Sequence, residues 1–398
     1  MLISSSYRRR WKKLSQAVYL RWRSLGTGLL LLWLFLILNE QKHPFTKYAH
    51  AITNRSFELE ETYQSLPDGN SKSRANVRTS LDDKQAQEFC GQHAFQPYPD
   101  RYTLRKVYDL LMINDELEWL EIRLNTLAAY VDYFVIVESP YTFTGRPKAL
   151  VLKENWSRFA EFHSQIIYHE VTDMPVGAKR AWDYEDHQRN AMFLQVIPGL
   201  EDKRKANVGD ILIVSDVDEI PRPITITVMR NCNFPRRLTL RSQFFYYGFQ
   251  WKHRGEEWAH PQATIYYGPE HTILPADLRN GEGGSWIKVW WYKTDLWNSG
   301  WHCSTCFPNI EEVLTKMSSF SHTGYDREEF RDRTHIVDRV RKGLDLFDRP
   351  GEEFIRVDNN QDIPEYLKLN RDRFGYLLDR DAWNAGFLDY SEHESAPD

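Results

Sequence analysis

The chain has 398 residues, of which 41% are hydrophobic and 27% charged, and its formal net charge is −5. This composition is typical of a folded globular protein and excludes wholesale disorder. A mean hydropathy of −0.60 excludes a polytopic membrane protein, and a pI near 6.3 gives no basic footprint for nucleic-acid binding.

The first 39 residues differ in charge from the remainder. They contain seven arginines and lysines and no acidic residue, which leaves a net charge of −12 on the other 359 residues. Residues 24–39 are uncharged and mostly apolar. Because a positive flank stays cytoplasmic, we predict a cytoplasmic tail at 1–23 and a transmembrane signal-anchor at 24–39. The alternatives are a cleaved signal peptide, with Ala49-His50-Ala51 as its cleavage site, and a hydrophobic segment without a membrane role.

A polar region poor in aliphatic residues follows the apolar segment. Its composition predicts a luminal stem at 40–100, which leaves a folded domain at 101–390 and a short tail at 391–398. N-glycosylation sequons begin at Asn54 and Asn155, and they are compatible with a luminal domain.

Cysteines are few, and they suit the same compartment. They are Cys90, Cys232, Cys303 and Cys306. An oxidising lumen permits disulfides, and four cysteines allow three pairings. A second Cys-x-x-Cys motif is missing from the sequence, so we expect a structural role for these residues rather than a metal or redox role.

From residue 107 onward, strand and helix patterns alternate. Short apolar runs predict strands at 107–113, 134–137, 165–171 and 211–214. Helices are predicted at 182–196 and where Leu117, Leu120, Leu124 and Leu127 recur at helical spacing. The later part adds predicted strands at 238–247 and 285–292 and an amphipathic helix marked by Phe330, Thr334, Val337 and Leu344. This order predicts βαβ units in a layered α/β domain, followed by a half of mixed strands.

The sharpest chemical signal follows the apolar strand at 211–214, in the run Ser215-Asp216-Val217-Asp218-Glu219. Side chains alternate along an extended chain, so Asp216 and Asp218 are expected on the same side of a strand end. Ligands of open α/β sheets bind at that edge, and two carboxylates suit Mg²⁺ or Mn²⁺ with phosphate oxygens. The pattern indicates a nucleotide-sugar transferase. The alternative is an aspartyl-phosphate phosphatase, which would need a downstream acidic pair on another strand, whereas the only adjacent Asp pair, Asp82-Asp83, lies upstream in the predicted stem.

Aromatic residues make up 14% of the chain and gather at 244–301. Aromatic rings offer flat apolar faces with polar tips, which suit sugar rings. Trp251, Trp258 and Trp301 lie beside glycine or charged residues, and we predict that they form the wall of an acceptor site.

Several stretches between residues 107 and 380 carry a resemblance to a known family. They are Asn114-Asp115-Glu116-Leu117 through Glu121-Ile122-Arg123, 131–139, Gly145-x-Pro147-Lys148, Gly209-Asp210-Ile211 into Asp216-x-Asp218-Glu219-Ile220-Pro221, Gly300-Trp301-His302-Cys303-x-x-Cys306-Phe307, and Arg373-Phe374-x-Tyr376-Leu377-Leu378-Asp379. In these stretches the chain resembles glycosyltransferase family 17, the β-1,4-mannosyl-glycoprotein β-1,4-N-acetylglucosaminyltransferases, which add the bisecting N-acetylglucosamine.

The resemblance implies a GT-A-like fold, a UDP-GlcNAc donor, a Mn²⁺ or Mg²⁺ ion and an inverting transfer to a mannose of an N-glycan. It also implies a type II protein of the Golgi membrane with its catalytic domain in the lumen. On this sequence, Asp216 and Asp218 are expected to hold the metal and the diphosphate. Glu219 is expected to orient them or to coordinate, and His302 is a candidate for a further metal ligand or for a contact to phosphate.

Other roles implied by the resemblance fall on less distinctive positions. The expected donor-binding residues are Asn114, Glu138, Lys148 and Arg189. Attack by the acceptor hydroxyl needs a carboxylate as general base. Candidates for this base are Glu282, Asp295 and Glu312, which the sequence does not separate. A different glycan acceptor, or a non-catalytic glycan-binding protein, is the alternative reading of the whole chain.

Overall fold

The computed structural model describes residues 81–391, apart from residue 176 and residues 320–326. All of them belong to one structural unit. The predicted cytoplasmic tail, signal-anchor and most of the stem lie outside the described residues, as does nearly all of the predicted C-terminal tail. Within the described ranges, the helices are too short or too polar to cross a bilayer.

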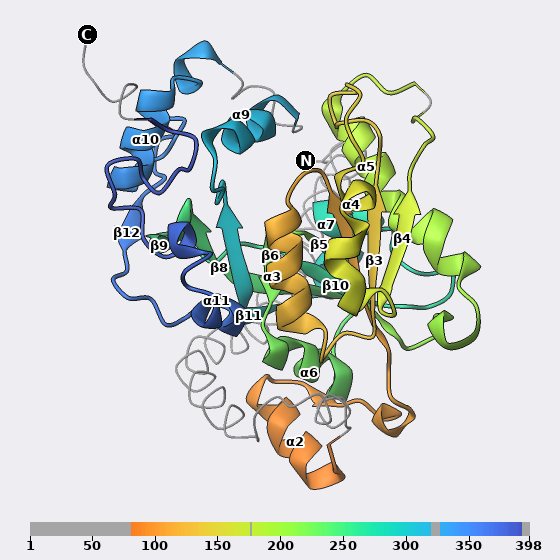
Figure 1. The fold of residues 1–398 in the computed structure, drawn as a ribbon. Coiled ribbons are helices and arrows are strands. Elements are labelled where there is room, and N and C mark those ends of the chain that lie inside the picture. Colours follow the sequence, from red (N-terminus) through yellow and green to blue (C-terminus); the bar gives the residue numbers. More distant parts are fainter. Residues whose placement is uncertain (1–80, 176, 320–326, 392–398) are drawn as a thin grey trace, which may run out of the picture. The chain divides into compact units, whose positions relative to one another are not determined.

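Strands and helices follow one another along the described chain (Figure 1). The strands are β1 (Gln96–Pro97), β2 (Val107–Ile113), β3 (Tyr133–Glu138), β4 (Ile166–Glu170), β5 (Ile211–Asp216), β6 (Glu219–Pro221), β7 (Cys232–Asn233), β8 (Arg237–Tyr246), β9 (Gly248–His253), β10 (Gln262–Ile265), β11 (Lys293–Ser304) and β12 (Phe354–Arg356). The helices are α2 (Asp83–Gln92), α3 (Leu117–Leu127), α4 (Val151–Glu154), α5 (Ala181–Ala191), α6 (Pro223–Asn231), α7 (Pro275–Asn280), α8 (Trp286–Trp291), α9 (Ile310–Ser319), α10 (Arg333–Lys342) and α11 (Glu365–Leu369).

Four parallel strands form the part of the main sheet that carries the site, in the order β4-β3-β2-β5. From β2 the chain adds β3 and β4 on one side and then returns to add β5 on the other. The strand order therefore reverses between β2 and β5. Ligands of open α/β sheets bind outside the carboxyl ends of the strands at such a switch point. In this chain those ends are Ile113 and Asp216.

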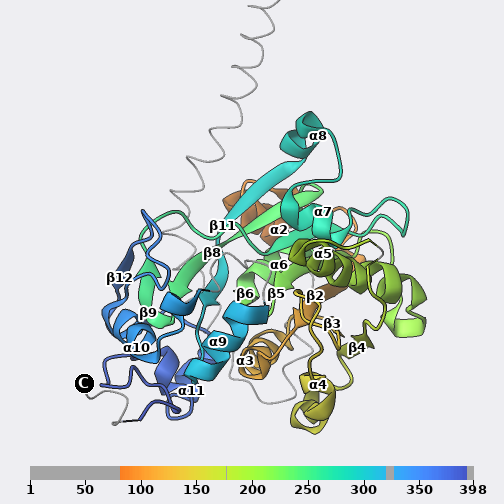
Figure 2. The same ribbon diagram turned by 90° about the horizontal axis from the view of Figure 1, so that it is seen from above.

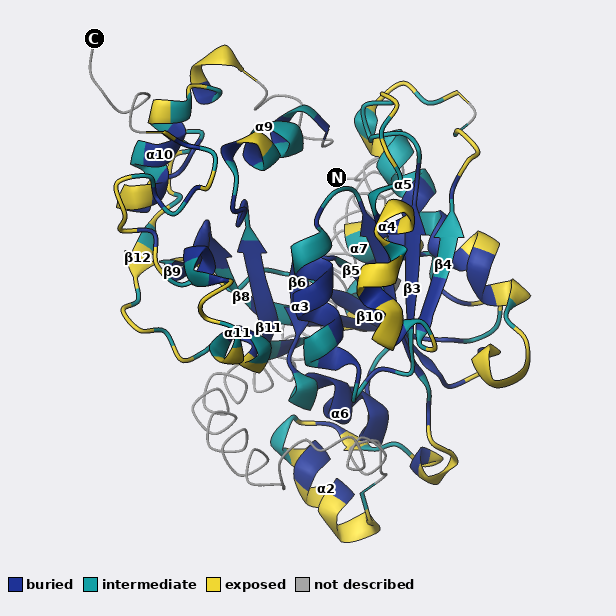
Figure 3. Cartoon of the chain, viewed as in Figure 1, coloured by how far each residue is buried: buried dark blue, intermediate teal, exposed yellow. Residues whose placement is uncertain are grey.

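Both faces of the parallel strands are covered, which explains their apolar sequences. On β2, Leu111 and Ile113 pack into the core that includes the apolar side of α3. The intervening Leu110 packs into a second core with Met192 and Phe193, which follow α5. Strands β2, β3 and β5 are accordingly buried along most of their length, as the dark blue arrow of β3 in Figure 3 illustrates, while the edge strand β4 is only half-buried after Ile167. Burying each such aliphatic side chain contributes roughly 1.5–3 kcal/mol.

The second half of the sheet is mixed. Strand β10 pairs antiparallel with β5 and leads to β8, β9 and β12. Strand β11 lies parallel to β8 and antiparallel to the short β6, with α8 and α9 at its two ends (Figure 2). In this register His302 of β11 stands opposite Glu219 of β6. The pairing of β11 with β6 thus brings a residue more than 80 positions away to the acidic turn.

The predicted mixed α/β architecture is confirmed, and the predicted strands 107–113, 134–137, 165–171 and 211–214 match β2 to β5 to within two residues at each end. The strand predicted at 285–292 is wrong, because this stretch contains helix α8. Its aromatic and branched residues favour a strand. However, a strand needs a neighbour for its backbone groups, and Trp286 and Trp291 are 71% and 54% exposed.

Two disulfides join the four cysteines, Cys90 to Cys232 and Cys303 to Cys306. The first attaches α2, whose residues the composition assigned to the stem, to the end of α6. Helix α2 is polar and buries only Ala86, Phe89 and Cys90, so its composition does not distinguish it from a linker. The second disulfide closes a short turn at the end of β11, directly after His302.

Candidate active site

The turn between β5 and β6, residues 216–219, is here called the acidic turn. Arg123 of α3 binds the backbone of this turn. The guanidinium forms a bidentate pair with Asp109 of β2, with both N···O distances 2.7 Å and neither side chain exposed. It also donates to the backbone carbonyls of Asp216 and Glu219, at 3.2 and 2.5 Å. One buried ion pair thus fixes the backbone of the turn at the switch point.

Asp216, the first acid of the turn, faces two arginines. Its carboxylate oxygens accept hydrogen bonds from Arg189 of α5 at 3.1 Å and from Arg279 of α7 at 2.6 Å. Burial opposes its ionisation, but the charges of Arg279 and Arg189 outweigh burial and lower the pKa of Asp216. In the described part of the chain, Nη1 of Arg189 is buried without a hydrogen-bond partner. Arg189 therefore keeps the two N–H donors of Nη1 for an anionic ligand.

Glu219 is fully buried, and its carboxylate is saturated. It accepts hydrogen bonds from Arg279 at 2.8 Å, from the indole of Trp258 at 2.7 Å and from the backbone N–H of Asp216 at 3.0 Å. Burial opposes its ionisation, but Arg279 above all holds the pKa of Glu219 well below its usual range. Glu219 consequently holds Arg279 beside Asp216 and has no open position for a ligand.

Asp218 lies on a different set of partners. Its carboxylate is 3.3 Å from Nζ of Lys316 on α9 and 3.6 Å from Nδ1 of His302. The imidazole is stacked between the rings of Phe244 and Trp258, with centroids 5.1 and 4.9 Å away. Nδ1 of His302 is buried and has no hydrogen-bond partner among the residues that the structure describes. The stacking therefore presents an unsatisfied ring nitrogen to Asp218.

This arrangement differs from the shared metal site that the sequence predicted. The chain turns at Val217 into β6, so the alternation of an extended strand stops, and Asp216 and Asp218 meet different partners. Both oxygens of Asp216 are taken by arginines. In the described ranges no three His, Cys, Asp or Glu residues surround a common metal position. Asp218 and His302 still fit a divalent cation, because Mg²⁺ is commonly held by one or two carboxylates together with phosphate oxygens and water.

Of the predicted donor-binding residues, Glu138 has a structural role in this arrangement. It is unexposed and accepts hydrogen bonds from the backbone N–H groups of Leu152 and Lys153, at 3.0 and 3.3 Å, so it caps α4. A contact of Glu138 with ribose or uracil is therefore not supported. Lys148 donates to the carbonyl of Asn114 at 2.9 Å, which places both residues at the carboxyl end of β2.

The predicted acceptor wall is corrected by burial. Trp301 and Trp251 are only 3% and 7% exposed, and both belong to the packed core. The indole of Trp301 donates to Asp362 at 2.9 Å. Trp258 is half-buried, and it supports Glu219 and His302 as described above. Trp251 and Trp301 therefore present no open face to a sugar, and Trp258 supports the site residues.

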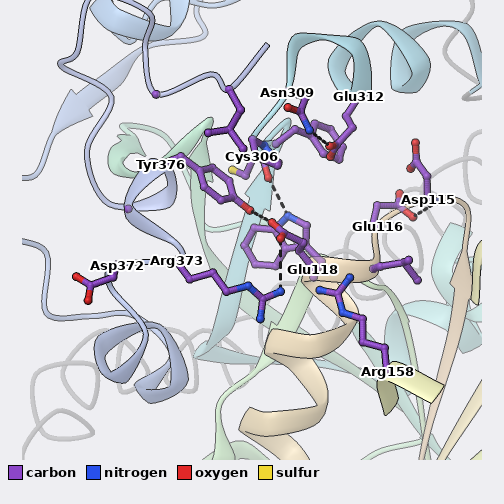
Figure 4. A pocket seen from close by; sticks show the side chains of 17 residues that line it. Asp115, Glu116, Glu118, Arg158, Cys306, Asn309, Glu312, Asp372, Arg373 and Tyr376 are labelled. Carbon is purple, nitrogen blue, oxygen red and sulfur yellow. Dashed lines mark hydrogen bonds and ion pairs between the residues drawn. The ribbon is translucent and has the colours of Figure 1, made fainter. Parts of the chain in front are cut away.

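The three candidates for the general base lie in different surroundings. Glu282 is exposed in the glycine-containing loop after α7. Asp295 is near the start of β11 and lies 3.4 Å from Arg241. Glu312 of α9 lines a cavity of about 550 Å³ (Figure 4) and lies one helical turn before Lys316, which contacts Asp218 of the acidic turn. Of the three, only Glu312 combines a ligand-sized space with proximity to the turn.

The cavity is acidic. Burial and the neighbouring Asp115 raise the pKa of Glu116 to about 7. Burial and Glu312 raise the pKa of Asp115, and burial, Glu118 and other carboxylates raise that of Glu312. Several carboxyl groups of this cavity therefore hold protons more strongly than exposed ones do.

Sequence reasoning missed three cations of the site, namely Arg123, Arg279 and Lys316. Arg123 had a detectable signal, because it stands among the apolar positions of α3, where a charge needs a partner. Arg279 lies 60 residues after Glu219, and no local pattern distinguishes it from a surface arginine. Lys316 is likewise marked only by its position one helical turn after Glu312.

Together, the fold and the site define an α/β protein with a candidate ligand site at the switch point of its sheet, formed by the acidic turn and its arginine, lysine and histidine partners. The chain belongs to glycosyltransferase family 17, since a model of that family matches residues 47–384. This match confirms the resemblance that the sequence motifs indicated.

Named relatives agree with the family. The chain is 28% identical over 306 residues to the human beta-1,4-mannosyl-glycoprotein 4-beta-N-acetylglucosaminyltransferase and 28% identical to that of Rattus norvegicus. These matches cover 70% of this chain but 56% and 55% of the relatives, so the chain spans about half the length of the curated relatives it matches. Among solved structures, the UDP complex of glucosyl-3-phosphoglycerate synthase from Mycobacterium tuberculosis is 12% identical over 42% of this chain and 50% of that chain. The TM-score of this match is 0.22, which is too low to support a statement about the fold of this chain.

Proposed function

We propose that this protein is an inverting glycosyltransferase with a GT-A-like fold, which transfers N-acetylglucosamine from UDP-GlcNAc to a mannose of an N-glycan in β-1,4 linkage. The observation that carries the proposal is the family match over residues 47–384, which contain the acidic turn. Relatives that bear this activity as their name support the choice of donor and acceptor.

The charges of the site suit a nucleotide diphosphate at the switch point. Arg189 offers its unpaired N–H donors to a phosphate oxygen. Arg279 keeps Asp216 and Glu219 ionised and so fixes the shape of the turn. A Mn²⁺ or Mg²⁺ ion on Asp218 and His302 would supply positive charge to the departing UDP. Phe244 and Trp258 hold the histidine ring in the orientation that this role needs.

We further propose a type II topology in the Golgi membrane, with residues 24–39 as the anchor and the described residues in the lumen. The basic charges ahead of the apolar segment support this orientation. Both disulfides suit an oxidising compartment, and Asn155 of the second sequon is exposed at the end of α4.

The test uses the full chain in detergent micelles with a mixed N-glycan pool as acceptor. UDP-GlcNAc, other UDP-sugars and GDP-mannose are supplied separately, with Mn²⁺ or with EDTA, and released nucleotide is measured. We expect metal-dependent release of UDP from UDP-GlcNAc alone. Asp218→Asn should lower it by roughly 100-fold or more, because even outer-shell residues of metal sites contribute 10–100-fold.

Asp338→Asn is the matched control, because it makes the same change in an exposed pair with Lys342 on α10. Its turnover should equal that of the wild type. Equal turnover by Asp218→Asn, or release from GDP-mannose but not from UDP-GlcNAc, would contradict the proposal. Binding of UDP-GlcNAc without transfer to any N-glycan would overturn the proposed acceptor.

A further inference from the structure

The cavity of Figure 4 is built from five separate parts of the chain. They are the start of α3, the turn closed by Cys303 and Cys306, the first turn of α9, Arg158 after α4 and the C-terminal segment 372–388. The indole of Trp119 ties the first two together, because it donates to the carbonyl of Cys306 at 3.0 Å. The hydroxyl of Tyr376 donates to Glu118 and ties the last to the first. Hydrogen bonds between its walls thus fix the shape of the cavity.

Its lining favours an uncharged ligand rich in hydroxyl groups. Five carboxylates and two arginines line it, which gives a formal charge of −3. An acidic cavity repels a diphosphate, so the donor nucleotide belongs at Arg189 and Arg279 instead. Carboxylates and amides are strong acceptors and donors for sugar hydroxyls, and about 550 Å³ falls in the range of small-ligand sites. An oligosaccharide has the required chemistry.

Helix α9 connects this cavity to the acidic turn. Glu312 and Lys316 are four residues apart and therefore lie on the same side of the helix, one turn from each other. Glu312 lines the cavity, and Nζ of Lys316 lies 3.3 Å from Oδ2 of Asp218. A ligand beside Glu312 is consequently about one helical turn, roughly 5 Å, from the residue that contacts the turn.

Glu312 differs from the other acids of the cavity in its partners. Its Oε1 accepts a hydrogen bond from Asn309, and in the described ranges no arginine, lysine or histidine lies within 4 Å of its carboxylate. Glu118, in contrast, is 3.5 Å from Arg373, and Glu116 accepts two backbone N–H bonds in a buried position. The acids that face Glu312 are Asp115, Glu116, Glu118 and Asp389, while Lys316 is the cation on its own helix.

We infer that this cavity binds the acceptor glycan and that Glu312 is the general base. The inference rests on the proposed transferase function. In the step, the acceptor hydroxyl oxygen forms a bond to the anomeric carbon of the donor sugar. The bond from that carbon to the diphosphate oxygen breaks, and its electron pair leaves with UDP. The hydroxyl proton moves to the carboxylate of Glu312 and then to solvent.

Glu312→Gln in the full chain tests this assignment. Transfer to the N-glycan pool should fall by roughly 10²–10⁴-fold in kcat, the usual contribution of a general base. The Kd for UDP-GlcNAc should change less than about twofold. The wild-type rate should fall as the pH drops through the raised pKa of Glu312, because the base must be ionised, and the residual rate of the variant should lack this dependence.

Glu311→Gln is the matched control, because Glu311 is the exposed neighbour on the same helix, and its kcat should equal that of the wild type. A second variant, Leu388→Trp, adds bulk at the exposed rim of the cavity and should raise the KM for the glycan by roughly tenfold or more, with donor binding unchanged. If the wild type transfers sugar and Glu312→Gln transfers it equally well, the inference fails while the proposed function stands. If the wild type neither binds nor uses UDP-GlcNAc, the proposed function itself fails.

Discussion

Arg123 carries the geometry of the acidic turn, although it is unexposed and contacts no solvent. Replacing it with methionine keeps much of its volume but leaves Asp109 buried without its partner. Removing one member of a buried ion pair costs about 3–5 kcal/mol, so we expect Arg123→Met to lower the free energy of unfolding by that amount in urea titrations. UDP-GlcNAc turnover should fall as well, because the carbonyls of Asp216 and Glu219 lose their donor.

The double variant Arg123→Met/Asp109→Leu is the control for this prediction. Since the double variant removes both charges, its loss of unfolding free energy should be clearly smaller than the sum of the losses of Arg123→Met and Asp109→Leu. If the losses add, the pair is not the source of the stability. The urea titration of the four proteins decides between these outcomes.

For most contacts of the site, one of the two residues can be predicted from the sequence and its partner cannot. Asp216 and Asp218 are detectable because they directly follow an apolar strand, and His302 because it stands in a distinctive motif. Arg279 and Lys316 come from elements 60 or more residues away, and their contacts depend on how α7 and α9 pack. Residue type and spacing contain no information on that packing, so the division of the two aspartates between different cations could not be predicted.

Among the elements, β11 fits closely against β6 and β8, and Gly300 makes that fit possible. A Cβ at this position would lie 2.6 Å from the carbonyl oxygen of Ile220 and 2.9 Å from Oγ of Ser242. Gly300→Ala should therefore force β11 away from β6 and lower the free energy of unfolding by about 1–3 kcal/mol. Turnover should fall too, because His302 lies two residues further along the same strand. Denaturant unfolding and UDP release measure the two effects.

Gly199→Ala serves as the comparison, since a Cβ there would meet no atom within 4 Å. Its stability should stay within about 0.5 kcal/mol of the wild type. An equally stable Gly300→Ala protein would show that β11 tolerates displacement from β6.

Helices and strands could be predicted where a single local sequence pattern determines the type of element. The apolar run 211–214 reads as a buried strand because both of its faces are covered, and the leucines of α3 repeat at helical spacing. The pairing of β11 between β6 and β8 joins residues about 60 to 80 positions apart, which no local pattern shows. The residue types of helix α8 favour a strand, whereas the absence of a strand beside it among the described residues is a property of the folded chain.

For the molecule as a whole, the disulfide between Cys90 and Cys232 links positions 142 residues apart. A cross-link over such a long loop restricts the unfolded chain, and losing a native disulfide typically costs 2–5 kcal/mol. We expect Cys90→Ser/Cys232→Ser to lose about this much stability in denaturant titrations and to release α2, which buries only three residues. Protection of α2 amides in hydrogen exchange should drop while protection of β2 and β5 persists. Unchanged protection of α2 would show that its packing alone holds it.

The same cross-link has a consequence for the fate of a damaged molecule. It closes a covalent ring from Cys90 to Cys232, and the ring encloses both aspartates of the acidic turn. The segment 172–180 lies within this ring and is exposed at most of its described positions, so it is a natural target for a protease. A single cut there opens the ring without dividing the molecule, because the two pieces remain joined through sulfur. In an oxidising compartment a nicked protein can thus keep its parts together until a reductant separates them.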